Sequence, residues 1–222
     1  QVETDHTERR RIEARFGPLM REEPRLGALV SYVGNKTVPV LRLYRYKEAF
    51  AFRFVEEFVD RFGLTQEDTL FDPFCGMGTT LFVARQHGIP AVGVDRLPIA
   101  AFIARKLPLF SSVEPQSLRE TFETLKNRVA TTEPAGVASD VAIMQVAFPP
   151  ETLLALRRWK GAIDALPSPL QDIFLLLFFA ILEPCSYTAK DGQFLRLKRD
   201  KRVADPAEML QHKVAEAERD IV

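Results

Sequence analysis

The clearest helical pattern in the chain lies between Glu48 and Phe62. Apolar residues recur there at spacings of three and four, charged residues lie between them, and Gly63 follows the run. This spacing predicts an amphipathic helix that ends at the glycine. Its aromatic residues Phe50 and Phe54 are expected in the hydrophobic core, although nucleic acid bases could also stack on such rings.

Two short units, each a strand followed by a helix, come next. The apolar runs and the aspartates that close them are Thr69–Phe71 with Asp72, and Ala91–Val94 with Asp95. Helical patterns begin at Thr79 and at Pro98. Strands and helices in this alternation predict an α/β fold with a parallel sheet and right-handed crossovers.

Beyond Pro108 the pattern predicts mainly helices. The expected elements are a helix over 115–130, a third strand over Val141–Phe148, and helices over Glu151–Leu166, over Leu170–Leu182 and from Pro206 onward. Leu170–Leu182 is apolar nearly all round, which predicts a helix buried on every side. The stretch Ser186–Arg202 is polar and basic, with a turn signal at Asp191 and Gly192.

Composition and charge exclude several classes of protein. The 222 residues are 46% hydrophobic and 27% charged, as in ordinary globular proteins, and 30 basic residues balance 30 acidic ones. No overall positive field is therefore available to hold nucleic acid. Cys75 and Cys185 do not form a disulfide framework, and no apolar run is long enough to cross a bilayer. From these two features we expect a cytoplasmic protein. Its three histidines are scattered along the sequence, so we expect no metal site.

The strongest chemical signal follows the first predicted strand. Gly76 and Gly78 permit a tight turn and the close approach of a ligand, and the next helix offers free backbone N–H groups. The turn lacks the lysine and the glycine spacing of a Walker A loop. Leu81 stands where a dinucleotide-binding turn carries glycine or alanine, which disfavours NAD and FAD without excluding them.

Two aspartates favour S-adenosylmethionine over a dinucleotide. Asp72 would attract the cationic amino-acid end of that cofactor and would repel a diphosphate. Asp95 lies 19 residues after Gly76, where a carboxylate accepts both ribose hydroxyls. Asp95 would serve NAD equally well, and Asp72 could instead only cap the turn. Cys75 has no base beside it in the sequence, so we do not expect it to act as a nucleophile.

Two segments resemble the motifs of a known family. Residues 71–80 (FDPFCGMGTT) and 93–100 (GVDRLPIA) are similar to the cofactor-binding motifs of S-adenosylmethionine-dependent DNA methyltransferases that modify exocyclic amino groups. In this family the target is N6 of adenine or N4 of cytosine. Residues 43–50 (LYRYKEAF) resemble, more weakly, the segment that packs across the methionine end of the cofactor. The resemblance covers about residues 40–200.

The resemblance implies a fold and a set of binding residues. The fold would be the Rossmann-like methyltransferase fold, a parallel-rich sheet flanked by helices, with a helical insertion or extension. Residues 1–40 would form an irregular arm, 41–110 the cofactor-binding half, and 111–222 a continuation truncated at its C-terminus. The residues assigned to the cofactor are Asp72, Pro73, Phe74, Cys75, Gly76, Gly78, Thr79, Thr80, Asp95, Arg96, Lys47 and Phe50.

One motif of the family is missing from the sequence. These enzymes use Asp/Asn/Ser-Pro-Pro-Tyr/Phe to hold the target amino group and to stack on the flipped base. Here the sole Pro-Pro pair, Pro149-Pro150, lies between Phe148 and Glu151 and is interpreted as a helix start. The catalytic residues are unknown, and we expect them after Val222 or on a second chain. An RNA methyltransferase and a non-catalytic cofactor-binding subunit are the alternatives.

Basic residues are concentrated in one stretch that could contact DNA phosphates. These residues are Arg196, Lys198, Arg199, Lys201 and Arg202. The sole acidic residue between them is Asp200. Such a stretch would position DNA without reading its sequence, whereas the simpler interpretation is a solvated loop.

Overall fold

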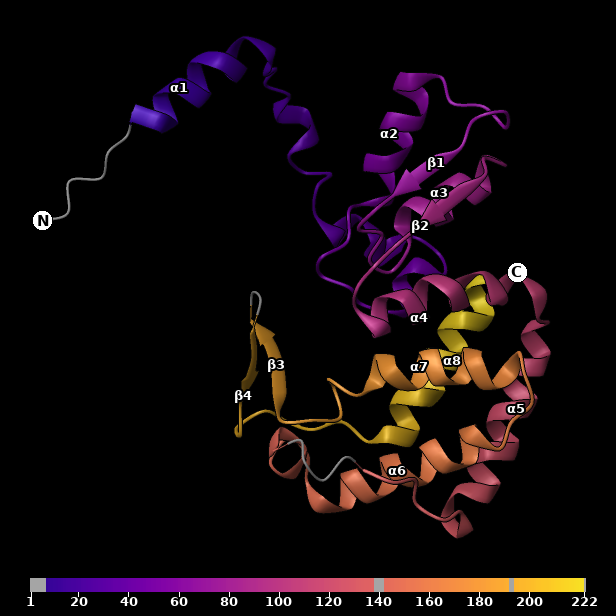
Figure 1. Cartoon of the computed structure of the whole chain (residues 1–222). Helices are drawn as coiled ribbons and strands as arrows, with labels where there is room; N and C mark the ends of the chain where they lie inside the picture. Colours follow the sequence, from indigo (N-terminus) through magenta and orange to yellow (C-terminus); the bar gives the residue numbers. More distant parts are fainter. Residues whose placement is uncertain (1–6, 138–141, 192–193, 222) are drawn as a thin grey trace, which may run out of the picture.

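The computed structural model describes residues 7–137, 142–191 and 194–221 (Figure 1). An arm of one α-helix and several short 3-10 segments precedes the first strand. These elements are α1 (Thr7–Phe16), η1 (Gly17–Leu19), η2 (Pro24–Leu26), η3 (Tyr32–Thr37) and η4 (Leu41–Leu43). The charge-rich start of the sequence predicts a short helix over about residues 4–16. The structure is helical there from Thr7 onward, and residues 4–6 lie outside the described part.

Both predicted strand–helix units are present. Strand β1 (Leu70–Asp72) leads into helix α3 (Thr79–Gln86), and strand β2 (Ala91–Gly93) leads toward helix α4 (Pro98–Lys106). The two strands are parallel, with Asp72 opposite Gly93. Because parallel strands end at the same edge of a sheet, the two segments that carry the predicted cofactor motifs begin side by side.

Helix α2 (Phe52–Phe62) packs beside α3. Its Val55 and Val59 form a small core with Val83 and Ala84 of α3. Phe52 also packs against this core, whereas Phe54, Phe58 and Phe62 form a row of ring contacts along the helix. Phe50, just before the helix, is 45% exposed. The expectation that Phe50 is a core residue is therefore wrong, and Phe54 is only partly buried. The helix has two apolar sides, and its valine side is the one that packs inward.

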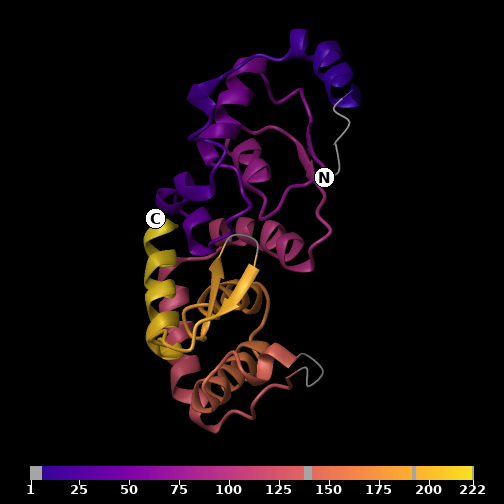
Figure 2. The same ribbon diagram turned by 90° about the vertical axis from the view of Figure 1, so that its left-hand side faces the viewer.

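Most of the remaining chain is helical. The elements are η5 (Leu107–Ser112), α5 (Pro115–Arg128), η6 (Val129–Thr131), η7 (Ala142–Gln145), α6 (Pro150–Asp164), α7 (Leu170–Ile181) and α8 (Pro206–Asp220). Helix α7 lies between α4 and α6 and also contacts α8, as Figures 1 and 2 show. Its Phe174 and Leu177 are fully buried, as its uniformly apolar sequence predicts.

The third strand expected over residues 141–148 is absent from the described part of that segment. Residues Ala142–Gln145 form a 3-10 turn, and Val141 lies outside the described residues. The carbonyl of Ala147 accepts a hydrogen bond from the Tyr187 N–H at 2.7 Å, so the segment pairs with a loop and not with a sheet. A short apolar run in the sequence does not distinguish a strand of a sheet from such a 3-10 turn.

A β-hairpin occupies the polar stretch where the sequence predicted only a turn. Strand β3 (Thr188–Asp191) pairs antiparallel with strand β4 (Phe194–Leu197), and the turn residue Gly192 lies outside the described residues. The alternation of apolar and basic residues in β4 was a strand signal that the overall polarity concealed. Among the described residues, no helix combines the length and apolarity needed to span a membrane.

Candidate functional site

The turn after β1 depends on two glycines. Gly76 has φ 52° and Gly78 has φ 89°, a left-handed region in which a side chain is strained. A Cβ atom on Gly76 would lie 3.0 Å from the Tyr46 ring, and one on Gly78 would lie 3.0 Å from the Cβ atom of Ala104. The turn is therefore packed against Tyr46 and helix α4.

The carboxylate of Asp95 holds this turn against the end of β2. Its Oδ2 accepts a hydrogen bond from the Gly76 N–H at 2.9 Å, and its Oδ1 accepts one from the Leu97 N–H at 2.8 Å. The Cys75 N–H donates to the Val94 carbonyl at 3.0 Å. Asp95 therefore fixes the backbone of the loop that we expect to bind a ligand.

Asp72 caps the same turn from the other strand. Its Oδ1 accepts a hydrogen bond from the Phe74 N–H at 3.0 Å, which is the turn-forming role considered as an alternative above. Within the described residues its second oxygen accepts no hydrogen bond. Asp72, Thr80 and Phe50 line one groove.

Asn35 connects the N-terminal arm to the start of α3. Its side-chain nitrogen donates to the Phe50 carbonyl at 2.8 Å and to Thr79 Oγ1 at 3.4 Å, and its oxygen accepts from the Phe52 N–H at 2.6 Å. The residue is buried. Sequence reasoning missed it, because a lone asparagine in an irregular arm carries no motif.

The other residues assigned to the cofactor differ widely in exposure. Phe74 is 84% exposed, and Pro73 and Arg96 are also exposed, whereas Thr79 and Thr80 are buried at the start of α3. Lys47 is half-buried. The thiol of Cys75 is buried; burial first, and the Asp72 and Asp95 carboxylates second, raise its pKa. A thiol with a raised pKa is a poor nucleophile, in agreement with the expectation that Cys75 does not act as one.

Comparisons with known proteins decide the family. The chain is 32% identical over 193 residues to the Type II methyltransferase M.BsoBI of Geobacillus stearothermophilus. It is 33% identical over 199 residues to the Type II methyltransferases M.AvaI of Nostoc sp. and of Anabaena variabilis. These alignments cover 85% to 86% of the chain. The chain belongs to the DNA methyltransferase family.

This result confirms the family indicated by the two motifs. The chain spans only 38% to 40% of the length of these relatives. No family model matches the chain, and no solved structure matches it. The parallel strands are compatible with a methyltransferase fold.

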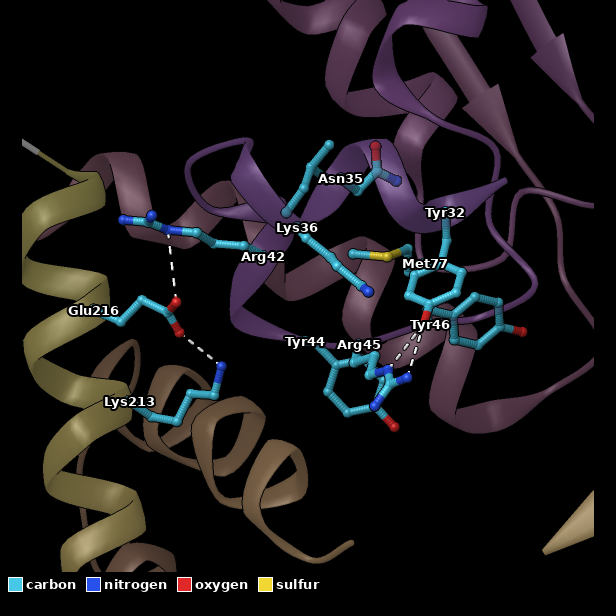
Figure 3. A pocket seen from close by; sticks show the side chains of 11 residues that line it. Tyr32, Asn35, Lys36, Arg42, Tyr44, Arg45, Tyr46, Met77, Lys213 and Glu216 are labelled. Carbon is cyan, nitrogen blue, oxygen red and sulfur yellow. Dashed lines mark hydrogen bonds and ion pairs between the residues drawn. The ribbon is translucent and has the colours of Figure 1, made fainter. Parts of the chain in front are cut away.

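A polar pocket adjoins the glycine turn through Tyr46 and Met77 (Figure 3). Its volume is about 270 Å³, and η3, η4 and α8 supply most of its lining. Arg45 donates to the Tyr32 hydroxyl at 2.9 Å, which lowers the pKa of that tyrosine. Lys213 pairs with Glu216 at 2.7 Å. These cations are therefore largely engaged within the protein.

The residues predicted to contact DNA lie on β4 and the loop after it. Arg196, Lys198, Arg199 and Arg202 are exposed. Lys201 is different: its ammonium donates to the carbonyls of Glu183 at 2.6 Å and Thr188 at 2.7 Å, and burial lowers its pKa. Lys201 thus fastens the base of the hairpin, while its four neighbours face solvent.

Proposed function

We propose that the chain is the cofactor-binding part of an S-adenosylmethionine-dependent DNA methyltransferase with a Rossmann-like fold. The target would be the exocyclic amino group of adenine or cytosine. The observation that carries this proposal is the left-handed glycine turn held by Asp95 at the end of two parallel strands. The similarity to Type II methyltransferases supports DNA as the substrate. The division at residues 40 and 110 and a cytoplasmic location are part of the same proposal.

The residues of the turn fit this cofactor in shape and in charge. Gly76 and Gly78 allow the left-handed turn, and the first turn of α3 would offer backbone N–H groups beside them. Asp95 would accept the ribose hydroxyls while it keeps its backbone contacts, because each carboxylate oxygen has two lone pairs. The free oxygen of Asp72 would face the cationic amino-acid end.

The chain's contribution to the reaction would be positioning. The bound cofactor supplies an electrophilic methyl group on a sulfonium. The glycine turn and the two aspartates would fix its orientation, and a fixed orientation accelerates an in-line transfer. The residues that hold the target amine and take up its proton belong to a motif that this sequence lacks. We therefore expect the 222 residues to bind the cofactor and to methylate nothing alone.

The contact with DNA would come from the exposed basic residues of β4 and its following loop. Arg196, Lys198, Arg199 and Arg202 face solvent, where phosphates are accessible. Their contacts would add affinity without selecting a sequence.

Calorimetry and a methyl-transfer assay test this function. We expect saturable heat with S-adenosylmethionine, none with NAD, and no transfer of labelled methyl groups to DNA or RNA by the chain alone. Saturable binding of NAD would contradict the cofactor assignment. Methyl transfer to RNA would favour the RNA alternative, and transfer to DNA by the chain alone would overturn the assignment of the catalytic motif to another segment.

A further inference from the structure

Residues 35–46 form a strap whose two ends lie on the segment that we expect to bind the cofactor. At one end, the Asn35 side chain donates to Oγ1 of Thr79, the first residue of α3, at 3.4 Å. At the other end, the Tyr46 ring covers Gly76, where a Cβ atom would lie 3.0 Å from it. The position of the strap therefore affects the glycine turn directly.

The middle of the strap reverses direction at Val40. This residue has φ 67° and ψ −48°, and the Leu41 N–H donates to the Pro39 carbonyl across it at 2.8 Å. Such angles and such a hydrogen bond define the γ-turn of positive φ, which is rare and strained. Among the described residues, no other non-glycine residue has a positive φ. A β-branched side chain makes this conformation still less favourable.

Asp220, the last residue of α8, holds this γ-turn. Its Oδ2 accepts hydrogen bonds from the Val40 N–H at 2.7 Å and from Arg42 Nε at 3.1 Å. The Arg42 guanidinium also donates to its Oδ1, and the Asp220 side chain is 0% exposed. A strained conformation persists only where its surroundings impose it. The buried carboxylate is therefore what imposes positive φ on Val40.

The segment after Val40 has little freedom to absorb a change in this turn. Leu41 and Leu43 are buried in the main core at 1% and 0% exposure. Tyr46 then lines the polar pocket beside Met77 of the glycine turn (Figure 3). A different φ at Val40 would rotate this segment about the backbone and would shift the Tyr46 ring on the turn.

We propose that Asp220 is a positioning residue for cofactor binding, which acts through the γ-turn at Val40 and sets where Tyr46 lies on the glycine turn. This inference rests on the proposed function. Asp220 does not line the polar pocket, so its effect passes through the strap. A merely structural ion pair would change stability alone, whereas a positioning residue also changes the affinity of the folded protein for the cofactor.

Calorimetry with S-adenosylmethionine tests this role at low temperature, and far-UV circular dichroism confirms that each variant is folded. We expect Asp220→Ala to bind the cofactor about fivefold more weakly or worse, in the range of coupling between separate sites. Asp220→Asn keeps an acceptor for the Val40 N–H and should bind within about twofold of the unsubstituted chain. Glu218→Ala is the matched control on α8, because its carboxylate pairs with Arg119 and not with the strap.

Val40→Gly provides the rescue. Glycine adopts positive φ without strain, so the double variant Asp220→Ala/Val40→Gly should recover most of the lost affinity. Tyr46→Leu tests the same route from its other end. It should weaken cofactor binding by itself, and Asp220→Ala added to it should cause little further loss, because substitutions that act through one contact are not additive.

Native affinity in folded Asp220→Ala would overturn the proposal, and so would a loss that Val40→Gly does not recover. If Asp220→Ala fails to fold, the double variant with Val40→Gly decides in the same way: native affinity supports the proposal, and weak binding by the folded double variant overturns it.

Hydrogen exchange of the ligand-free protein separates this inference from the proposed function. Absence of S-adenosylmethionine binding by the unsubstituted chain would remove the cofactor assignment. Faster exchange of the Gly76 and Gly78 amides in Asp220→Ala would still show that Asp220 positions the turn. Unchanged exchange of these amides, with cofactor binding intact, would remove only the positioning role.

Discussion

The Asp95 carboxylate accepts a hydrogen bond from the backbone N–H of Gly76 at 2.9 Å, across the boundary between the two strand–helix units. The residue expected to bind ribose hydroxyls therefore also shapes the loop on which the cofactor would lie. Folding and ligand binding share this side chain. Substitutions at Asp95 should consequently affect both, and the comparison of two different substitutions is needed to separate the effects.

Replacement of Asp95 by Ala should lower the free energy of unfolding of the ligand-free protein by about 1 to 3 kcal/mol, because the buried Gly76 N–H loses its acceptor. Asp95→Asn retains an acceptor oxygen and should cost less. Both variants should bind S-adenosylmethionine more weakly. Urea unfolding and calorimetry measure the two effects. Unchanged unfolding of Asp95→Ala would show that the hydrogen bond contributes nothing to the fold.

Gly76→Ala should destabilise the turn by about 1 to 3 kcal/mol, because a Cβ atom at positive φ is strained and this one would also press against the Tyr46 ring. Gly17→Ala is the control, since no atom lies within 4 Å of a Cβ built there and its φ is not positive. Thermal unfolding of both variants tests this difference. Equal melting temperatures would mean that the turn relaxes without cost.

The regular elements and the turn could be predicted from the sequence because their signals are local. Helix α3 starts at Thr79, and the parallel strands align Asp72 with Gly93. Both features follow from the hydrophobic period and from the positions of the glycines and aspartates in the sequence. The hydrogen bonds of Asn35 could not be predicted, because they join residues 15 to 44 positions apart in the chain. Long-range side-chain contacts leave no periodic trace in a single sequence.

The error at Phe50 has a different physical cause. A hydrophobic period identifies the apolar face of a helix but not what covers that face. In α2 the valines and the phenylalanines satisfy the same period, but the core with α3 is formed by Val55 and Val59, with Phe52 packed against it. The same limit explains Lys201, whose charge suggested a phosphate contact although its ammonium is bound to two backbone carbonyls.

Stability should fall at alkaline pH because of Cys185. Burial raises the pKa of this thiol from 9.0 to about 12. Between these values the unfolded chain loses the thiol proton and the folded chain keeps it, so stability is fully present below about pH 9 and declines as pH rises toward 12. Cys185→Ala should flatten this decline in urea unfolding from pH 8 to 10. An unchanged slope would assign the decline to other groups, such as Tyr44, whose pKa is also raised by burial.

Asp220→Ala should destabilise the protein by about 2 to 4 kcal/mol, because it removes the acceptor of a largely buried pair. The Asp220 side chain is 0% exposed; it accepts from the Val40 N–H at 2.7 Å and pairs with the Arg42 guanidinium. Glu218→Ala breaks a pair with Arg119, which is 70% exposed, and should cost less than about 1 kcal/mol. Similar losses in the two variants, measured by urea unfolding, would show that α8 is not held through Asp220.

The last prediction separates the roles of the lysines in the basic stretch. Lys198 and Arg199 are exposed, whereas the Lys201 ammonium donates to the Glu183 and Thr188 carbonyls and holds the base of the hairpin. If the exposed side chains contact phosphates, each substitution by Ala should reduce the slope of log affinity for duplex DNA against log salt by about one. Their removal should leave the melting temperature nearly unchanged.

Lys201→Ala should show the opposite behaviour. It leaves two partly buried carbonyls without their donor, so the free energy of unfolding should fall by about 1 to 3 kcal/mol, while the salt slope stays within error of the unsubstituted chain. Lys201→Arg, which keeps a donor, provides the control for charge. Titrations of labelled duplex at several salt concentrations, combined with urea unfolding, measure both quantities. A reduced salt slope in Lys201→Ala with unchanged stability would mean that the ammonium leaves its carbonyls to contact DNA, and the hairpin would then have to be held by its strand pairing alone.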